Sequence, residues 1–173
     1  RILWNATSNK IYCAKRTDSV SIIDAVMDTI ITEIPVMDEP VGLACNSIDN
    51  KVYCSGLNYI TVINGQSNQI TNTLQLGDYE SIQDLFWSSL DNRLYCYTIE
   101  NEYPSQHYFG KLTIIDGVSD SIITTLSLSE WKNYSSGILF PGCFAEDITG
   151  NRLYFADFNM ARISVIDPTA TGI

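Results

Sequence analysis

The sequence predicts an all-β fold built from about four copies of one four-stranded antiparallel unit. Two recurring features predict it. A motif of the form Asn, Lys or Arg, aliphatic residue, Tyr, then Cys or Phe occurs four times, and each copy precedes a β-branched segment that ends in Asp or Asn. No segment shows the 3.6-residue period of an amphipathic helix, so helical repeats are excluded.

The tyrosine motif sets the length of the repeat. Its tyrosines are 41, 42 and 59 residues apart, so the unit is about 42 residues long and the third copy carries an insertion. The four copies are Asn9-Lys10-Ile11-Tyr12-Cys13, Asn50-Lys51-Val52-Tyr53-Cys54, Asn92-Arg93-Leu94-Tyr95-Cys96 and Asn151-Arg152-Leu153-Tyr154-Phe155.

Three further segments recur around this motif and complete the unit. An apolar segment precedes the motif, the β-branched segment follows it, and a third segment comes after that; the last of these recurs at residues 29–34, 69–74 and 121–126. Four short strands separated by turn residues form an antiparallel meander, and a unit of this length is typical of a β-propeller blade. The predicted blades are residues 1–40, 41–82, 83–136 and 137–173, and the last lacks its outer strand.

About four blades leave strand edges of the predicted propeller without a partner in the chain. Four blades is the lower limit for a closed ring, and an unpaired strand edge invites pairing with another chain. The chain also starts at Arg1 without a signal region and stops at Ile173 just after a strand-like segment, so both ends look cut. We therefore expect part of a longer propeller, or a subunit whose edges are met by neighbours.

Composition narrows the possible partners. The chain has 45% hydrophobic residues and a formal net charge of −10, spread along its length. This charge argues against nucleic acid and anionic membrane surfaces, because both require a basic face. No stretch approaches the roughly 20 apolar residues that cross a bilayer.

The repeat resembles the YVTN family of β-propeller repeats found in surface-layer and secreted proteins. The resemblance rests on Asn50-Lys51-Val52-Tyr53-Cys54, then Ile60 to Asn64, then Asn68 to Leu74, and it covers nearly the whole chain. It implies a seven-bladed propeller at the cell surface or outside the cell, with no catalytic residues and no cofactor. Two departures stand out: Cys replaces the usual Val or Ala in three copies, and about four copies fall short of seven.

The third repeat contains the candidate recognition surface. The segments 97–110 and 130–137 are longer than their counterparts, and we expect both to be loops on one face of the blade. Aromatic side chains with polar tips on protruding loops are typical of recognition surfaces. The alternative is that the two loops pack on each other and cover the blade edge. The candidates are Tyr97, Tyr103, His107, Tyr108, Phe109, Trp131 and Tyr134.

Five cysteines and a single histidine, without a Cys-x-x-Cys pair, argue against a zinc site. If Asp49-Asn50 forms a two-residue hairpin turn, Cys45 and Cys54 face each other and are candidates for a disulfide. The alternative is that the cysteines are small buried hydrophobic residues between blades.

Two other patterns have a functional and a structural interpretation. The sequons at Asn5 and Asn133 are candidates for glycosylation if the protein is secreted. The acidic pairs Asp24…Asp28 and Asp116…Asp120 are too sparse for a calcium loop, and we expect them to bond their own turn backbone.

These features predict a non-catalytic extracellular module that binds a protein or glycan, or assembles with copies of itself. The alternative is a propeller enzyme with its site in the channel or in missing blades. His107 would then be the sole imidazole base, and carboxylates are available at Glu146, which breaks the apolar pattern of its repeat position, and in the long loops at Glu100, Glu102 and Glu130.

Overall fold

The computed structural model describes residues 1–37, 39–102, 107–132, 143–157 and 162–167, and for residues 129–132 and 157 it describes the backbone alone. This part of the chain is all β, which confirms the predicted fold class. Its strands form three four-stranded sheets and one three-stranded sheet, each an antiparallel meander in chain order. No helix that could cross a membrane was found among the described residues.

The sheets follow one another along the chain. The first contains β1 (Ile2–Asn5), β2 (Lys10–Lys15), β3 (Ser19–Asp24) and β4 (Thr29–Pro35); the second contains β5 (Gly42–Asn46), β6 (Lys51–Ser55), β7 (Tyr59–Asn64) and β8 (Ile70–Gln75). The third contains β9 (Glu80–Ser88), β10 (Arg93–Glu102), β11 (His107–Asp116) and β12 (Ile122–Lys132), and the fourth contains β13 (Phe144–Asp147), β14 (Arg152–Asp157) and β15 (Arg162–Ile166). β9 begins at Glu80, so the predicted boundary between residues 82 and 83 falls inside a strand.

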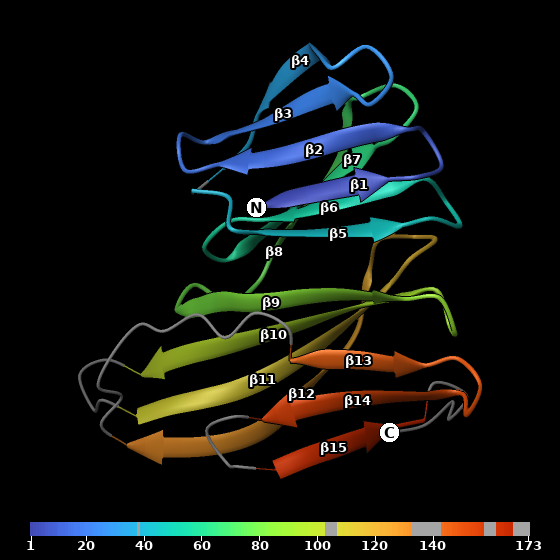
Figure 1. Ribbon diagram of the computed structural model, residues 1–173. Helices are drawn as coiled ribbons and strands as arrows, with labels where there is room; N and C mark the ends of the chain where they lie inside the picture. Colours follow the sequence, from blue (N-terminus) through green and yellow to red (C-terminus); the bar gives the residue numbers. More distant parts are fainter. Residues whose placement is uncertain (38, 103–106, 133–142, 158–161, 168–173) are drawn as a thin grey trace.

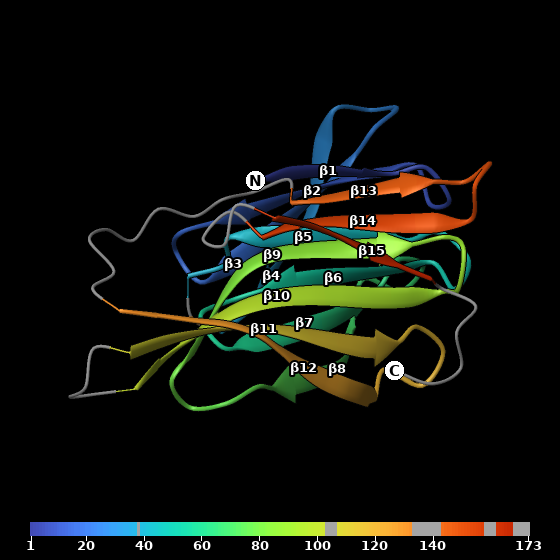
Figure 2. The ribbon, with the colours of Figure 1, turned by 90° about the horizontal axis from the view of Figure 1, so that it is seen from below.

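The four sheets fan out from a line on which their first strands lie (Figures 1 and 2). β5 contacts both β1 and β9. The fourth sheet joins this line beside β9, because the Phe86 and Phe144 rings stack with centroids 5.6 Å apart and the Cys143 N–H donates to Asp84 Oδ2 at 3.1 Å. This is the arrangement of neighbouring propeller blades.

Each sheet has two faces, and we call the one toward the following sheet its leading face and the other its trailing face. The motif tyrosines lie on leading faces, and Tyr12, Tyr53 and Tyr95 are fully buried. The leading face of each sheet packs against the trailing face of the next in three hydrophobic clusters. The strands between two neighbours are therefore apolar on both faces.

Asparagine and aspartate in the repeat form the turns at one end of the strands. The motif asparagines Asn9, Asn50, Asn92 and Asn151 all have φ between 50° and 53°, a left-handed conformation that Asn tolerates better than most residues. In the next turn, Asp24 Oδ1 accepts from the backbone N–H of Val26 and Met27, and Asp116 Oδ1 accepts from Val118 and Ser119. The predicted turn role is confirmed for Asp24 and Asp116, whereas the Asp120 side chain accepts from Lys51 Nζ and Tyr53 OH of the preceding sheet.

The motif lysine forms a polar contact between sheets, which we call the lysine clamp. Lys10 Nζ donates to Gly65 O at 2.7 Å and to Asn68 Oδ1 at 2.7 Å, so it joins β2 to the β7–β8 turn. Lys51 Nζ repeats this one sheet later, with Gly117 O at 2.9 Å and Asp120 Oδ2 at 2.8 Å. The turn that would receive Arg93 falls outside the described residues.

Removing one lysine clamp should destabilise the fold. We expect Lys51→Ala to lower the free energy of unfolding by about 1–3 kcal/mol, because Asp120, whose side chain is only 9% exposed, loses its cation. Arg16→Ala is the control, since the Arg16–Glu39 pair is exposed and should contribute less than about 0.5 kcal/mol. Urea unfolding followed by tryptophan fluorescence measures both, and equal losses in the two variants would contradict the clamp.

Candidate functional site

The third sheet is longer than the others at one end. β10 and β11 have ten residues each, whereas β6 has five and β7 has six. The additional residues form a hairpin that protrudes at the left of Figure 1. The prediction that residues 97–110 form a loop is therefore wrong for the described part of this segment, because Tyr97 to Glu102 pairs with His107 to Leu112.

Strand alternation separates the aromatic candidates that this segment carries. Tyr97 is buried with its ring centroid 5.1 Å from that of Phe155, and Tyr108 packs against the same cluster on the leading face. Phe109 and His107 lie on the trailing face, since neighbouring residues of a strand point to opposite sides. The candidates therefore do not form one patch, and Tyr97 is a core residue.

The remaining candidates are only partly described. Trp131 lies in β12, where its backbone pairs with Tyr108, so residues 130–132 continue a strand and do not begin a loop. Tyr103 and Tyr134 lie outside the described residues.

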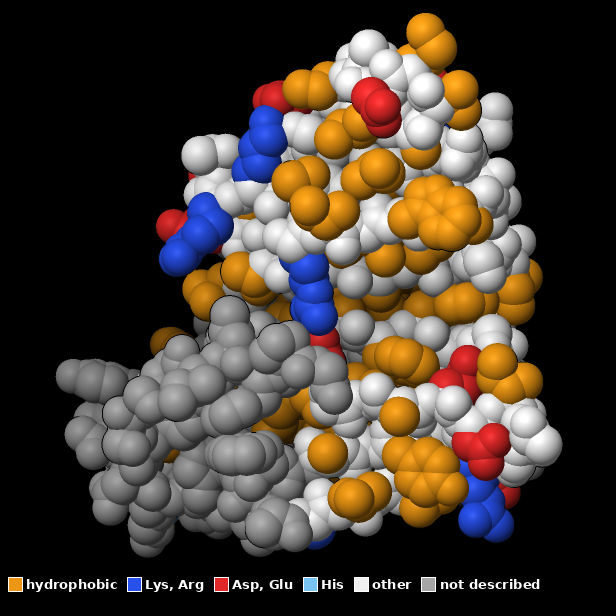
Figure 3. Space-filling view, in the orientation of Figure 1, with side chains coloured by type: hydrophobic (Ala, Val, Ile, Leu, Met, Phe, Trp, Pro, Cys, Tyr) orange, Lys and Arg blue, Asp and Glu red, His pale blue; other side chains and the backbone are white. Residues whose placement is uncertain are grey.

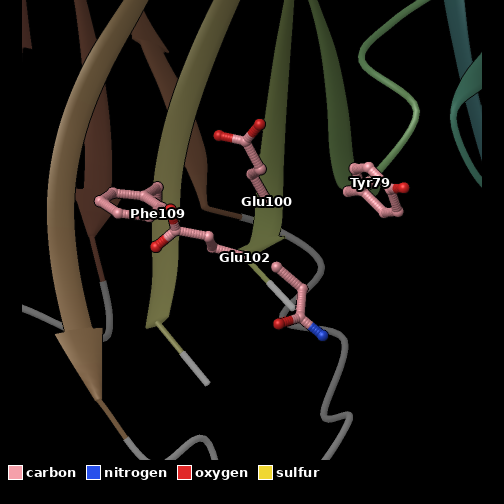
Figure 4. A pocket seen from close by; sticks show the side chains of 5 residues that line it. Tyr79, Glu100, Glu102 and Phe109 are labelled. Atoms are coloured by element: carbon pink, nitrogen blue, oxygen red, sulfur yellow. The ribbon is translucent and has the colours of Figure 1, made fainter. Parts of the chain in front are cut away.

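A hollow of about 260 Å³ lies at the protruding hairpin. It is lined by Tyr79 from the connection between β8 and β9, by Glu100, Asn101 and Glu102 of β10, and by Phe109 of β11. Figure 4 shows Tyr79 and Phe109 on either side of the two glutamates. Tyr79 reaches this position because its carbonyl accepts from the Asn101 N–H at 3.1 Å.

The electrostatics of the hollow favour a cation. Lys111 Nζ lies 2.9 Å from Glu80 Oε1 and 2.8 Å from Glu100 Oε2, so one ammonium group is shared between two carboxylates, and Glu102 also lines the hollow. Desolvation acts to lower the pKa of Lys111, but hydrogen bonds and charges from Glu100 and Glu80 outweigh it and raise that pKa. Lys111 therefore stays protonated, and two carboxylates share its single positive charge.

An aromatic ring beside carboxylates is a combination that binds a guanidinium or ammonium group. Tyr79 supplies a largely exposed ring, and Phe109 supplies a second ring on the other side of the carboxylates. Tyr79 was not predicted from the sequence, and no motif marks it, because its role depends on a backbone contact with a strand 22 residues away.

The predicted disulfide between Cys45 and Cys54 is contradicted by the strand register. Cys45 lies opposite Val52 and Cys54 lies opposite Leu43, because the connection between β5 and β6 has four residues and not two. All five cysteines are free thiols. Cys54 and Cys96 are buried between sheets, as the alternative interpretation expected.

The predicted glycosylation at Asn5 is also contradicted. Asn5 is fully buried; its Nδ2 donates to Asn50 Oδ1 at 2.9 Å and its Oδ1 accepts from the backbone of Thr7 and Ser8. A glycan on this nitrogen has no room in the folded chain. The sequon arises because an Asn that forms this turn is followed by small polar residues, and Asn133 lies outside the described residues.

Glu146, the carboxylate considered for catalysis, joins two sheets. Its carboxylate accepts from Ser88 Oγ at 2.6 Å, Ser89 Oγ at 3.0 Å and the Leu90 N–H at 3.2 Å. These contacts tie β13 to the β9–β10 turn and explain why an acid occupies this repeat position. Among the described residues, no group of three His, Cys, Asp or Glu side chains could hold a metal ion.

Solved structures with the same fold are β-propellers of the WD40 type. The chain is similar to the WD40 domain of Toxoplasma gondii coronin (TM-score 0.64, 10% identity, 90% of this chain and 39% of that one) and to the WD40 repeats of RRP9 (0.63, 12%, 95% and 49%). It is also similar to Saccharomyces cerevisiae Sqt1 (0.61, 11%, 97% and 42%). The chain thus spans less than half the length of these proteins. No family model and no curated protein matches it.

The thiols provide a test of the strand register. We expect iodoacetamide to leave Cys54 and Cys96 unmodified in the native chain, because both are buried and desolvation raises the pKa of Cys54 to about 12 and raises that of Cys96 as well. Peptide mass spectrometry measures this, with labelling in 6 M urea as the control in which all five react. A Cys45–Cys54 disulfide in the unreduced protein would contradict the register.

Proposed function

We propose that this chain is a non-catalytic extracellular β-propeller module that binds a protein partner through the hollow at the β10–β11 hairpin. The partner contributes a Lys or Arg side chain, which lies against Tyr79 and pairs with Glu100 and Glu102. The observation that carries the proposal is the acidic hollow flanked by two aromatic rings on the one hairpin that outgrows its counterparts in the described repeats. The same side-chain chemistry suits a protein segment better than a neutral glycan.

The extracellular placement rests on the resemblance of the repeat to YVTN propellers. Self-association is the second part of the proposal, and the exposed faces of the first and last sheets support it. Glu146, one of the carboxylates named for the enzyme alternative, accepts three hydrogen bonds that join two sheets, which gives it a structural role.

A peptide selection tests the binding role. A phage-displayed library of random 12-residue peptides, selected on the immobilised chain, should yield peptides enriched in Arg and Lys. We expect Tyr79→Ala and Glu102→Gln each to weaken the binding of a selected peptide at least about tenfold, and we expect affinity to fall as salt rises.

Asp78→Asn is the matched control, since it removes a neighbouring carboxylate that bonds Gln75 and does not line the hollow. Fluorescence anisotropy with a labelled peptide measures all three variants. Selected peptides without basic enrichment, or equal losses in the Asp78 control, would overturn the proposal.

A further inference from the structure

The trailing face of the first sheet is apolar and uncovered. Ile2 and Trp4 of β1 are 73% and 62% exposed, whereas Leu43 and Leu85, which occupy the position of Ile2 in the next two sheets, are each 6% exposed. Cys13 lies on this face too and is half-buried, while its equivalents Cys54 and Cys96 are buried. In Figure 3, hydrophobic side chains gather over β1 and β2.

The leading face of the last sheet is uncovered in the same way. Ile163 and Val165 of β15 are 71% and 55% exposed. Their equivalents in the three preceding sheets are fully buried or nearly so: Val20 and Ile22, Ile60 and Val62, Leu112 and Ile114. Hydrophobic side chains are again visible over this sheet in Figure 3.

These two faces are the two halves of a contact that the chain already makes three times. Inside the chain, a leading face always meets a trailing face. The first sheet offers an unused trailing face and the last offers an unused leading face, so the two are complementary to each other and not to themselves. Contacts of this heterologous kind join copies head to tail.

The two uncovered faces also carry opposite charges at the positions of the lysine clamp. Arg152 occupies the motif position of Lys10 and Lys51 on the last sheet, and its side chain is exposed. Asp28 occupies the position of Asn68 and Asp120 in the β3–β4 turn of the first sheet, has the same positive φ, and is exposed as well. Docking the two faces as inside the chain would bring Arg152 to Asp28 as Lys51 meets Asp120 at 2.8 Å.

We propose that two copies of this chain associate head to tail, each placing the leading face of its last sheet on the trailing face of the other's first sheet, with Arg152 paired to Asp28. This deepens the self-association part of the proposed function. The match between Arg152 and Asp28 favours a second copy as the occupant, because the copy presents both groups at the positions of the clamp. Two chains supply eight sheets, which is within the usual range of four to eight for a closed ring.

A charge swap across the predicted clamp tests the pairing. Sedimentation of the full chain should show a dimer whose dissociation constant rises at least tenfold in Arg152→Glu and in Asp28→Arg. Because the swap restores opposite charges at both contacts, the variant with both changes should return to within about threefold of the original. Arg16→Glu is the control, since it makes the same charge change at an exposed turn outside both faces and should leave the constant unchanged.

Two further measurements test whether the apolar faces of the first and last sheets are buried in the dimer. Trp4→Glu and Ile163→Glu should each yield monomers, and both side chains are exposed in the single chain, so folding is retained. Iodoacetamide labelling of Cys13 should slow as protein concentration rises, because a second copy covers its face as the neighbouring sheets cover Cys54 and Cys96.

Several results would contradict the head-to-tail dimer. A monomer at about 100 µM, a dimer indifferent to these variants, or assembly that grows beyond a dimer overturns the proposal. So does a natural polypeptide heavier than 19.4 kDa by further repeats that forms a ring alone. Peptide binding separates the two proposals, because the hollow lies on β10 and β11 and not on the docking faces. A chain that dimerises but binds no basic peptide refutes the binding role alone. A chain that binds the peptide but stays monomeric refutes the pairing alone.

Discussion

The structure depends on one constraint: a sheet of this repeat is apolar on both faces, so each face is buried only where another sheet covers it. The buried tyrosines on each leading face meet apolar residues on the next trailing face, and this contact occurs three times in the described part of the chain. Burial of this kind contributes roughly 25 cal/mol per Å² of apolar surface, so each additional neighbour stabilises the sheets already present. Charged and amide groups then fix how the sheets align, because the lysine clamp specifies which turn lies beside which strand.

Most of the fold could be predicted from the sequence because the repeat displays it four times. The structure explains why the motif recurs: its Asn takes a left-handed turn position, its Lys forms the clamp in the first two sheets, and its Tyr lies on the leading face. These residues recur at the spacing of the repeat, and repetition makes the pattern visible without any relative for comparison. The blade-like meander follows from them directly.

The register and the hollow could not be predicted in the same way. The turn after β5 was expected at Asp49-Asn50, but Asn46 accepts from the backbone of Ile48 and Asp49 and so widens the connection to four residues, which moves Cys45 away from Cys54. The segment from Tyr97 onward was expected to be a loop because it is longer than its counterparts, yet Tyr97 and Ile99 alternate along a strand and are buried. The hollow depends on Tyr79, whose neighbours come from another part of the chain.

The two ends of the strands are subject to different demands. The asparagine turns and the lysine clamps occupy one rim of the fan, where each sheet must match the next residue by residue. The hairpin between β10 and β11 lies at the opposite rim, and there it has gained several residues while the Lys10 and Lys51 clamps keep the same geometry. The rim with the clamps is therefore constrained by contacts between sheets, whereas the opposite rim tolerates insertions. New recognition surfaces can be added to this scaffold by lengthening hairpins at that rim, and the packing of the sheets does not change.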